Sequence, residues 1–254
     1  MFIRTENFRD FTRFYPVVTT IIAIQLSIWL LVFLFPAIGG PLFQWGVGVN
    51  FWISQGEYWR LVTPIFIHDP NGVMHVLFNS FSLVLFGPAL EQMLGKTKFI
   101  FAYLFTGVFA NLLTYFTEST MYSHVGASGA IFGIFGIYIF MVVFRKHLID
   151  QANAQVISTI VIIGLVMTFL RSGVNIFGHL FGFIGGVALG PIILRNVQPF
   201  SIWRNRRAPR NDDSIQFDPN RWNKKRFSIK KYARPAIWTI IILLVVLGLI
   251  ARLF

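Results

Sequence analysis

Residues 175–195 read NIFGHLFGFIGGVALGPIILR, an apolar segment in which glycine recurs at every fourth position. On a helix, Gly178, Gly182, Gly186 and Gly190 lie along one face, because residues four apart are neighbours. Small residues at this spacing let two helix backbones approach closely in lipid. The segment therefore predicts a membrane-spanning helix that packs through its glycines and carries His179 near its start.

Six other apolar segments have a length in the range of about 17–25 residues that a helix needs to cross the hydrocarbon layer. The predicted spans are 16–36, 73–94, 97–117, 127–144, 154–171, 175–195 and 236–253. A lone span must satisfy its own backbone hydrogen bonds, so each span is expected to be a helix. The sequence predicts an all-α membrane protein with a six-helix transmembrane bundle at 16–195 and one extra C-terminal transmembrane helix at 236–254.

The composition excludes an ordinary soluble enzyme. Of the 254 residues, 55% are hydrophobic and 13% are charged, whereas soluble domains carry about 25% charged residues. The absence of cysteine excludes disulfides, iron–sulfur clusters, thiolate zinc sites and a cysteine nucleophile. The first apolar stretch is longer than a signal-peptide core and lacks a clean cleavage site, so we expect it to be retained as an anchor.

The positions of Lys and Arg predict the orientation. Nineteen of the 22 lie on one side of the predicted spans, and only Arg60, Arg171 and Arg252 lie on the other. Because basic loops stay in the cytoplasm, residues 1–15 are expected to be cytoplasmic and the C-terminus external. The segment 196–235 is predicted to be a basic cytoplasmic linker that contacts anionic lipid. The net charge is +12, and the positively charged residues lie between apolar blocks. This pattern favours a membrane over nucleic acid as the partner.

The external loop at 37–72 is rich in aromatic residues and is expected to lie in the membrane interface. The pair Trp59 and Arg60 is predicted to hold this loop, with Arg60 donating to backbone carbonyl groups. Glu91, at the cytoplasmic end of the second span, is expected to be a structural hydrogen-bond acceptor.

Four polar residues are predicted to lie at the same external depth on three different spans. His75 and Asn79 open the second span and are four residues apart, so they share one helix face. Ser128 opens the fourth span, and His179 lies near the start of the sixth. Polar groups inside spans are costly and are functional candidates by default.

These residues predict the parts of a serine hydrolase. If the glycine faces of the fourth and sixth spans pack together, Ser128 meets His179, which can act as general base and then as general acid. The turn Gly126-Ala127-Ser128-Gly129 places free N–H groups at a helix start, where an oxyanion can be held. The oxyanion-stabilising groups are expected to be His75, Asn79 and the N–H groups of Ala127 and Ser128. No carboxylate is evident that could orient the histidine as a third member of the site. Phe132 is expected to pack against the imidazole instead.

Each of these residues, taken alone, also has a purely structural interpretation. Ser128 could be a small packing residue, His179 a hydrogen-bonded packing residue, and His75 with Asn79 an interhelical pair. His68, His75, His124 and His179 all lie toward the exterior, but no carboxylate set accompanies them. We therefore predict no metal site and no cofactor.

The chain resembles the rhomboid intramembrane serine proteases over nearly its whole length. The matching motifs are Tyr58-Trp59-Arg60, His75-Val76-Leu77-Phe78-Asn79, Glu91, Gly126-Ala127-Ser128-Gly129, and Gly178-His179-Leu180-Phe181-Gly182 followed by Gly185-Gly186. The resemblance implies a rhomboid-like six-helix core with a Ser128–His179 dyad in a water-filled cavity, substrates that are single-span proteins, and no cofactor. It also implies that the fifth span and the segment 171–175 gate lateral entry. Bacterial members often have Tyr where this chain has Phe132, which keeps the ring but lacks the hydroxyl.

The function predicted from these observations is an intramembrane serine endopeptidase of a bacterial-type plasma membrane, which cleaves transmembrane segments through a Ser–His dyad. Its expected partners are transmembrane substrates and the lipid bilayer, with no nucleic acid. One alternative is a non-catalytic rhomboid-like protein that binds membrane clients, although such proteins typically lack the serine or the histidine. A small transporter is disfavoured, because the polar groups cluster at one end of the spans and no inverted repeat is evident.

Overall fold

The computed structural model describes residues 1–2 and 6–201. The helices within these residues are α1 (Phe8–Phe14), α2 (Pro16–Leu34), α3 (Pro36–Gly46), α4 (Asn50–Ser54), α5 (Val73–Leu94), α6 (Lys96–Thr117), α7 (Ser128–Phe144), α8 (Gln151–Leu170) and α9 (Ile176–Ile193). Three single-turn 3-10 helices are η1 (Tyr58–Leu61), η2 (Thr63–Phe66) and η3 (Lys146–Leu148). The strands are β1 (Gly48–Val49) and β2 (Ser123–His124). The predicted linker at 196–235 lies mostly outside the described residues, and the predicted seventh span at 236–253 lies wholly outside them.

Six of the predicted spans fall within the described residues, and each contains one long helix. The helices α2, α5, α6, α8 and α9 are long and apolar enough to cross a membrane, and α7 is an apolar helix of 17 residues. The prediction of an all-α, multi-pass membrane protein is confirmed. Bounds differ by a few residues, as at α8, which starts early because the Asp150 side chain accepts from the Asn153 N–H and caps it.

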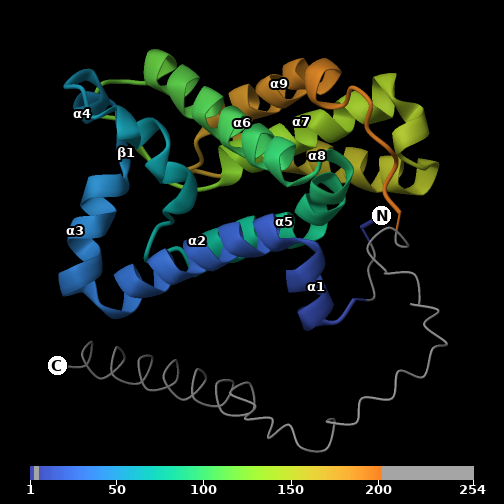
Figure 1. Cartoon of the computed structure of the whole chain (residues 1–254). Helices are drawn as coiled ribbons and strands as arrows, with labels where there is room; N and C mark the ends of the chain where they lie inside the picture. Colours follow the sequence, from blue (N-terminus) through green and yellow to red (C-terminus); the bar gives the residue numbers. More distant parts are fainter. Residues whose placement is uncertain (3–5, 202–254) are drawn as a thin grey trace, which may run out of the picture. The chain divides into compact units, whose positions relative to one another are not determined.

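Backbone contact between α7 and α9 forms the centre of the bundle, and α6 packs against both helices (Figure 1). A Cβ added to Gly182 would overlap the Gly129 carbonyl group, and one added to Gly186 would overlap that of Gly133. The glycine faces predicted from the sequence therefore meet. Since any side chain would force the backbones apart, these glycines determine how closely the two helices pack.

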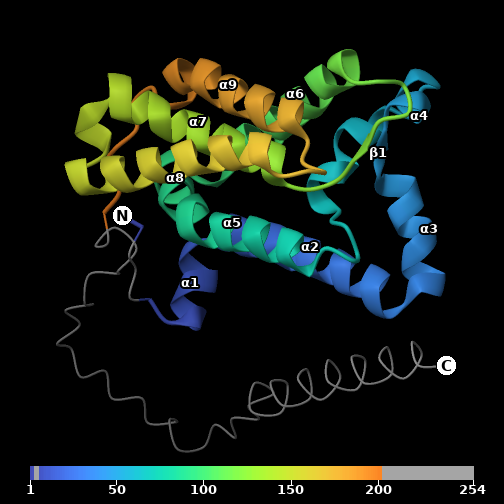
Figure 2. The same cartoon turned by 180° about the vertical axis from the view of Figure 1, so that it is seen from behind.

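The helix α8 lies against α7 and α9 and faces the viewer in Figure 2. It is the least buried of the long apolar helices, and its buried residues are Ile157, Val161 and Thr168. The helix is thus joined to the bundle along a narrow contact.

Glu91 connects α5 to the start of α2, which lies beside it. Its carboxylate accepts hydrogen bonds from the N–H groups of Val17 and Val18, at 3.0 and 2.9 Å. The first N–H groups of a helix have no partner within the helix, and the residue before α2, Tyr15, offers no side-chain cap. Glu91 therefore caps α2 from a neighbouring helix.

The loop at 37–72 is folded rather than extended. Arg60 is buried and donates from Nη1 to the carbonyl oxygens of Gln44 and Val47, both at 2.7 Å. The indole of Trp59 stacks on Trp45, with ring centroids 5.8 Å apart. These contacts close the loop around the Arg60 guanidinium.

The strand β1 in this loop pairs with β2 in an antiparallel ladder that the sequence did not predict. Gly48 lies opposite His124 and Val49 opposite Ser123. Two-residue strands are too short to show an alternating pattern of polar and apolar residues. Because β2 ends just before the turn at Gly126, the ladder joins the loop to the start of α7.

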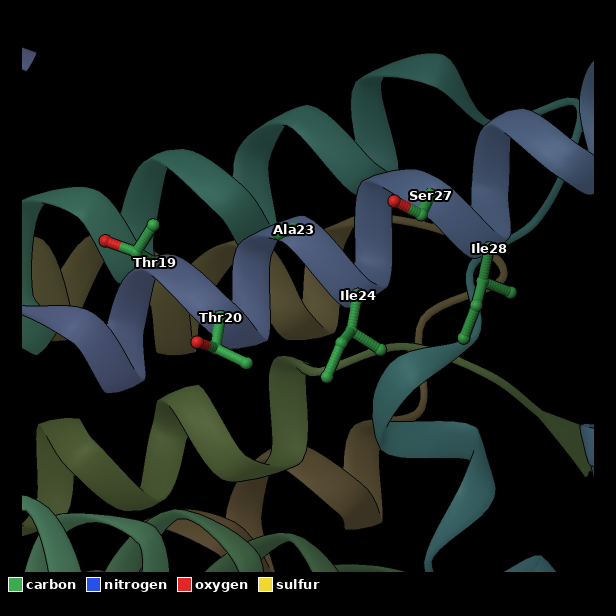
Figure 3. Close-up of a pocket in the computed structure, with 6 residues that line it drawn as sticks. All are labelled: Thr19, Thr20, Ala23, Ile24, Ser27 and Ile28. Atoms are coloured by element: carbon green, nitrogen blue, oxygen red, sulfur yellow. The ribbon is translucent and has the colours of Figure 1, made fainter. Parts of the chain in front are cut away.

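A hollow of about 420 Å³ runs along α2 (Figure 3), and its lining residues are Thr19, Thr20, Ala23, Ile24, Ser27 and Ile28. The hydroxyls of Thr19 and Thr20 donate to the carbonyl oxygens of Tyr15 and Pro16, one turn earlier. Their polarity is thus satisfied within α2. The lining includes no titratable group, so this hollow offers no chemistry.

The close packing of α7 on α9 through glycines predicts that one added methyl group destabilises the protein. We expect Gly186→Ala to lower the free energy of unfolding by roughly 1–3 kcal/mol, the usual cost of overpacking a core. The matched control is Gly40→Ala in α3, where an added Cβ has no neighbour within 4 Å. Thermal unfolding of both variants in detergent measures the difference. Equal stability of the two variants would contradict the close packing of α7 on α9.

Candidate active site

Ser128 is the first residue of α7 and follows a tight turn. Gly126 has a φ of +118°, a backbone conformation that favours glycine, and its N–H donates to the Pro64 carbonyl at 2.9 Å. Ala127 is fully buried and occupies the N-cap position without a side-chain cap hydrogen bond. The N–H groups of the first turn of α7 are therefore oriented toward the same end of the helix as the half-buried Ser128.

His75 and Asn79 approach this turn from α5. A Cβ on Gly126 would lie 2.6 Å from His75 Nε2, so the imidazole lies directly against the backbone of the turn. Asn79 is buried, and its Nδ2 donates to the His75 carbonyl at 2.9 Å. A side-chain amide has two N–H donors, which leaves one for another acceptor. The predicted oxyanion-stabilising residues His75 and Asn79 thus share one face of α5.

His179 lies in the first turn of α9, which Asn175 caps by accepting from the Gly178 N–H at 2.7 Å. The imidazole stacks on the Phe132 ring, with centroids 4.2 Å apart and planes 17° from parallel. Phe132 is one turn beyond Ser128 on α7. The stack therefore holds the imidazole beside the helix that carries the serine.

None of the hydrogen bonds found among residues 1–2 and 6–201 joins Ser128 to His179. The two residues are brought to adjoining ends of α7 and α9 by the contacts of Gly129 with Gly178 and Gly182. Catalytic hydrogen bonds are often long in the absence of substrate, so this geometry is compatible with a nucleophile and its base.

Thr168 on α8 is a site residue that the sequence did not predict. Its Oγ1 lies 2.8 Å from His179 Nδ1, and its side chain is almost completely buried. Thr168 lies in an apolar run, and no local pattern distinguishes it from a threonine that only packs. The contact depends on how α8 lies against α9, which spacing within one helix cannot reveal.

Two buried histidines lie outside the spans, one beside His75 and the other in β2. His68 precedes α5 and has its ring centroid 5.1 Å from that of His75; burial, and secondly the nearby His75, lowers the pKa of His68 to about 3. Burial also lowers the pKa of His124, in β2, to about 4. Both imidazoles are therefore neutral in the folded protein at neutral pH.

These two histidines predict a loss of stability in acid. Below about pH 6.5 the unfolded chain binds protons at His68 and His124 that the folded chain does not, so the unfolded state gains stability as the pH falls toward about 4. We expect the thermal midpoint to decrease over this range, and to decrease less in His124→Phe. The control is His147→Phe, at an exposed position. A slope that His124→Phe leaves unchanged would contradict the assignment.

Comparison with known proteins identifies the class. Residues 55–196 match the family model described as the rhomboid domain. A protein of Bacillus subtilis (strain 168) with the name "Putative rhomboid protease YdcA" is 50% identical over 190 residues. These residues cover 74% of this chain and 94% of YdcA. The rhomboid protease GluP of the same organism is 35% identical over 170 residues, 65% of this chain and 32% of GluP. Rhomboid-like protease 1 of Toxoplasma gondii is 31% identical over 158 residues, 59% of this chain and 52% of that protein.

The helical, multi-pass fold and these relatives define an intramembrane serine protease. The chain belongs to the rhomboid family.

Proposed function

We propose that Ser128 is the nucleophile and His179 the general base of this protease. The observation that carries the proposal is the stack of His179 on Phe132, one turn from Ser128, at the end where α7 and α9 touch. A serine hydroxyl is a weak nucleophile until a base accepts its proton. An imidazole held beside the start of α7 can accept that proton and later deliver it to the leaving amine.

The oxyanion formed during attack is proposed to be held by His75, by Asn79 and by the N–H groups of Ala127 and Ser128. The proposal is supported by the contact of His75 Nε2 with Gly126 and by the uncapped start of α7. Donors that are already oriented cost no reorganisation when the negative charge develops.

The length of α7 supports a site that lies below the external surface of the membrane. A helix of 17 residues spans about 25 Å, which is less than the ~30 Å of the hydrocarbon layer. Arg145 and Lys146 directly follow this helix and are proposed to lie at the cytoplasmic surface. Ser128, at the other end, would then lie a few ångströms below the external surface, with the N-terminus of the chain in the cytoplasm.

The proposed substrates are transmembrane segments of other membrane proteins in a bacterial plasma membrane. A site below the membrane surface is reached more directly by a segment within the bilayer than by a soluble peptide. The extra C-terminal span and the contact of the basic linker with anionic lipid are proposed from the sequence alone. Trp59, Arg60 and Glu91 are proposed to support the site indirectly, through the loop and helix contacts described above.

The dyad is tested by cleavage of a helix-destabilised transmembrane substrate by the purified protein. We expect Ser128→Ala and His179→Ala to lower kcat by about a thousandfold or more, as is typical when a nucleophile or its base is removed. Ser27→Ala on the exposed face of α2 and His147→Ala near η3 are matched controls that should retain activity. Cleavage that persists in Ser128→Ala or His179→Ala removes that residue from the mechanism. Substrate binding without cleavage by the wild-type protein would instead favour a client-binding protein.

A further inference from the structure

Thr168 makes two short contacts through a single hydroxyl group. Its Oγ1 lies 2.8 Å from the Gly164 carbonyl oxygen, one turn earlier on α8, and 2.8 Å from His179 Nδ1 on α9. Both distances are those of good hydrogen bonds. The hydroxyl has one hydrogen, so it can donate to only one of these two neighbours.

The position of that hydrogen follows from what each neighbour can do. A carbonyl oxygen only accepts, so the contact with Gly164 is a hydrogen bond only when Thr168 is its donor. The contact with His179 is then a hydrogen bond only when Nδ1 carries a proton and donates it to Oγ1. In the opposite arrangement, Thr168 would donate to Nδ1 and two oxygen atoms would face each other at 2.8 Å without a hydrogen between them.

We propose that Thr168 is a positioning residue that holds neutral His179 as the Nδ1–H tautomer, with the Gly164 carbonyl as the final acceptor. This inference rests on the proposed dyad, because it leaves Nε2 unprotonated and able to act as the base for Ser128. A carboxylate commonly orients the histidine in serine hydrolases. Here a hydroxyl that is itself oriented by its own helix performs that role.

The proton transfers remain balanced with this arrangement. As the Ser128 Oγ–C bond to the substrate carbonyl forms, the C=O π electron pair moves to the oxygen, which becomes the oxyanion. The Oγ proton moves to Nε2, and the imidazolium keeps its Nδ1–H bond to Thr168. When the substrate C–N bond breaks, the Nε2 proton passes to the leaving amine and His179 returns to the Nδ1–H tautomer. The hydrogen bond to Thr168 thus persists through both steps.

The two neighbours of the imidazole constrain different motions. The stack on Phe132 fixes the plane of the ring, and the hydrogen bond to Thr168 fixes its rotation within that plane. Phe132 also contacts α8, because a Cβ on Gly164 would lie 3.3 Å from its ring. The position of the sparsely buried helix α8 therefore controls the orientation of the base.

The kinetic test compares two substitutions at Thr168. Thr168→Val has nearly the same shape but no hydroxyl, and we expect it to lower kcat about tenfold, as for the loss of one neutral hydrogen bond, with little change in KM. Thr168→Ser keeps the hydroxyl and should retain activity within about threefold, as expected if the hydrogen bond survives. Thr159→Val makes the same change at an exposed position of α8 and should match the wild type. Equal activity of Thr168→Val and the wild type would overturn the proposal.

The spectroscopic test does not depend on activity. Long-range nitrogen–hydrogen NMR spectra of ¹⁵N-histidine-labelled protein distinguish the two neutral tautomers, and His179→Gln assigns the signal. We expect Nδ1–H in the wild type and in Thr168→Ser, and a shift toward Nε2–H in Thr168→Val. An Nε2–H tautomer in the wild type would overturn the proposal even if Ser128 and His179 prove essential. If the Nδ1–H tautomer is found but His179 proves dispensable for cleavage, the proposed function fails and the tautomer assignment stands.

Discussion

The close contact of α7 with α9 is the constraint on which the rest of the molecule depends. In lipid, helices are not driven together by the hydrophobic effect, so close packing of small residues has to supply the attraction. Gly129 and Gly133 on α7 meet Gly182 and Gly186 on α9 with no space for a side chain. This contact sets the start of α7 beside the start of α9. Residues from distant parts of the sequence thereby come to border one small volume.

A second constraint is the cost of polar groups inside the bilayer. Several buried polar side chains are paired with backbone carbonyls: Gln25 donates to Ile65, Asn111 to Leu61, and Tyr138 to Phe86. These pairs tie helices and loop together and leave little capacity for chemistry. The groups around the start of α7 differ, because His75 lies against a backbone turn and the half-buried Ser128 keeps its hydroxyl beside an uncapped helix start. These groups are the ones proposed to carry out the reaction.

The sequence was sufficient to predict what depends on periodicity and composition. Hydropathy placed the helices α2 and α5–α9, and the spacing of Gly182 and Gly186 predicted the face on which α9 packs. It was not sufficient for features set by contacts between elements. The β1–β2 ladder is too short to have a pattern, and the aromatic loop did not predict α3. The sequence predicted that Arg60 donates to backbone carbonyl groups of this loop, but not that these groups belong to Gln44 and Val47.

Thr168 shows the same limit within the site. Thr168 and His179 are 11 residues apart in the sequence and lie on different helices. They come into contact only because α8 packs against α9. A threonine within an apolar run is typical of packing, and the sequence offered only Phe132, with no carboxylate, to hold the imidazole. The structure places a hydroxyl beside this imidazole in addition to the Phe132 ring, because Thr168 Oγ1 lies 2.8 Å from His179 Nδ1.

Activation of Ser128 by His179 is the basis of the proposed mechanism. Treatment of the purified protein with a fluorophosphonate, followed by peptide mass spectrometry, tests it directly. We expect one phosphonyl adduct on Ser128, formed with loss of fluoride and abolished in His179→Ala. An adduct on another serine, or labelling of Ser128 at an undiminished rate in His179→Ala, would contradict it.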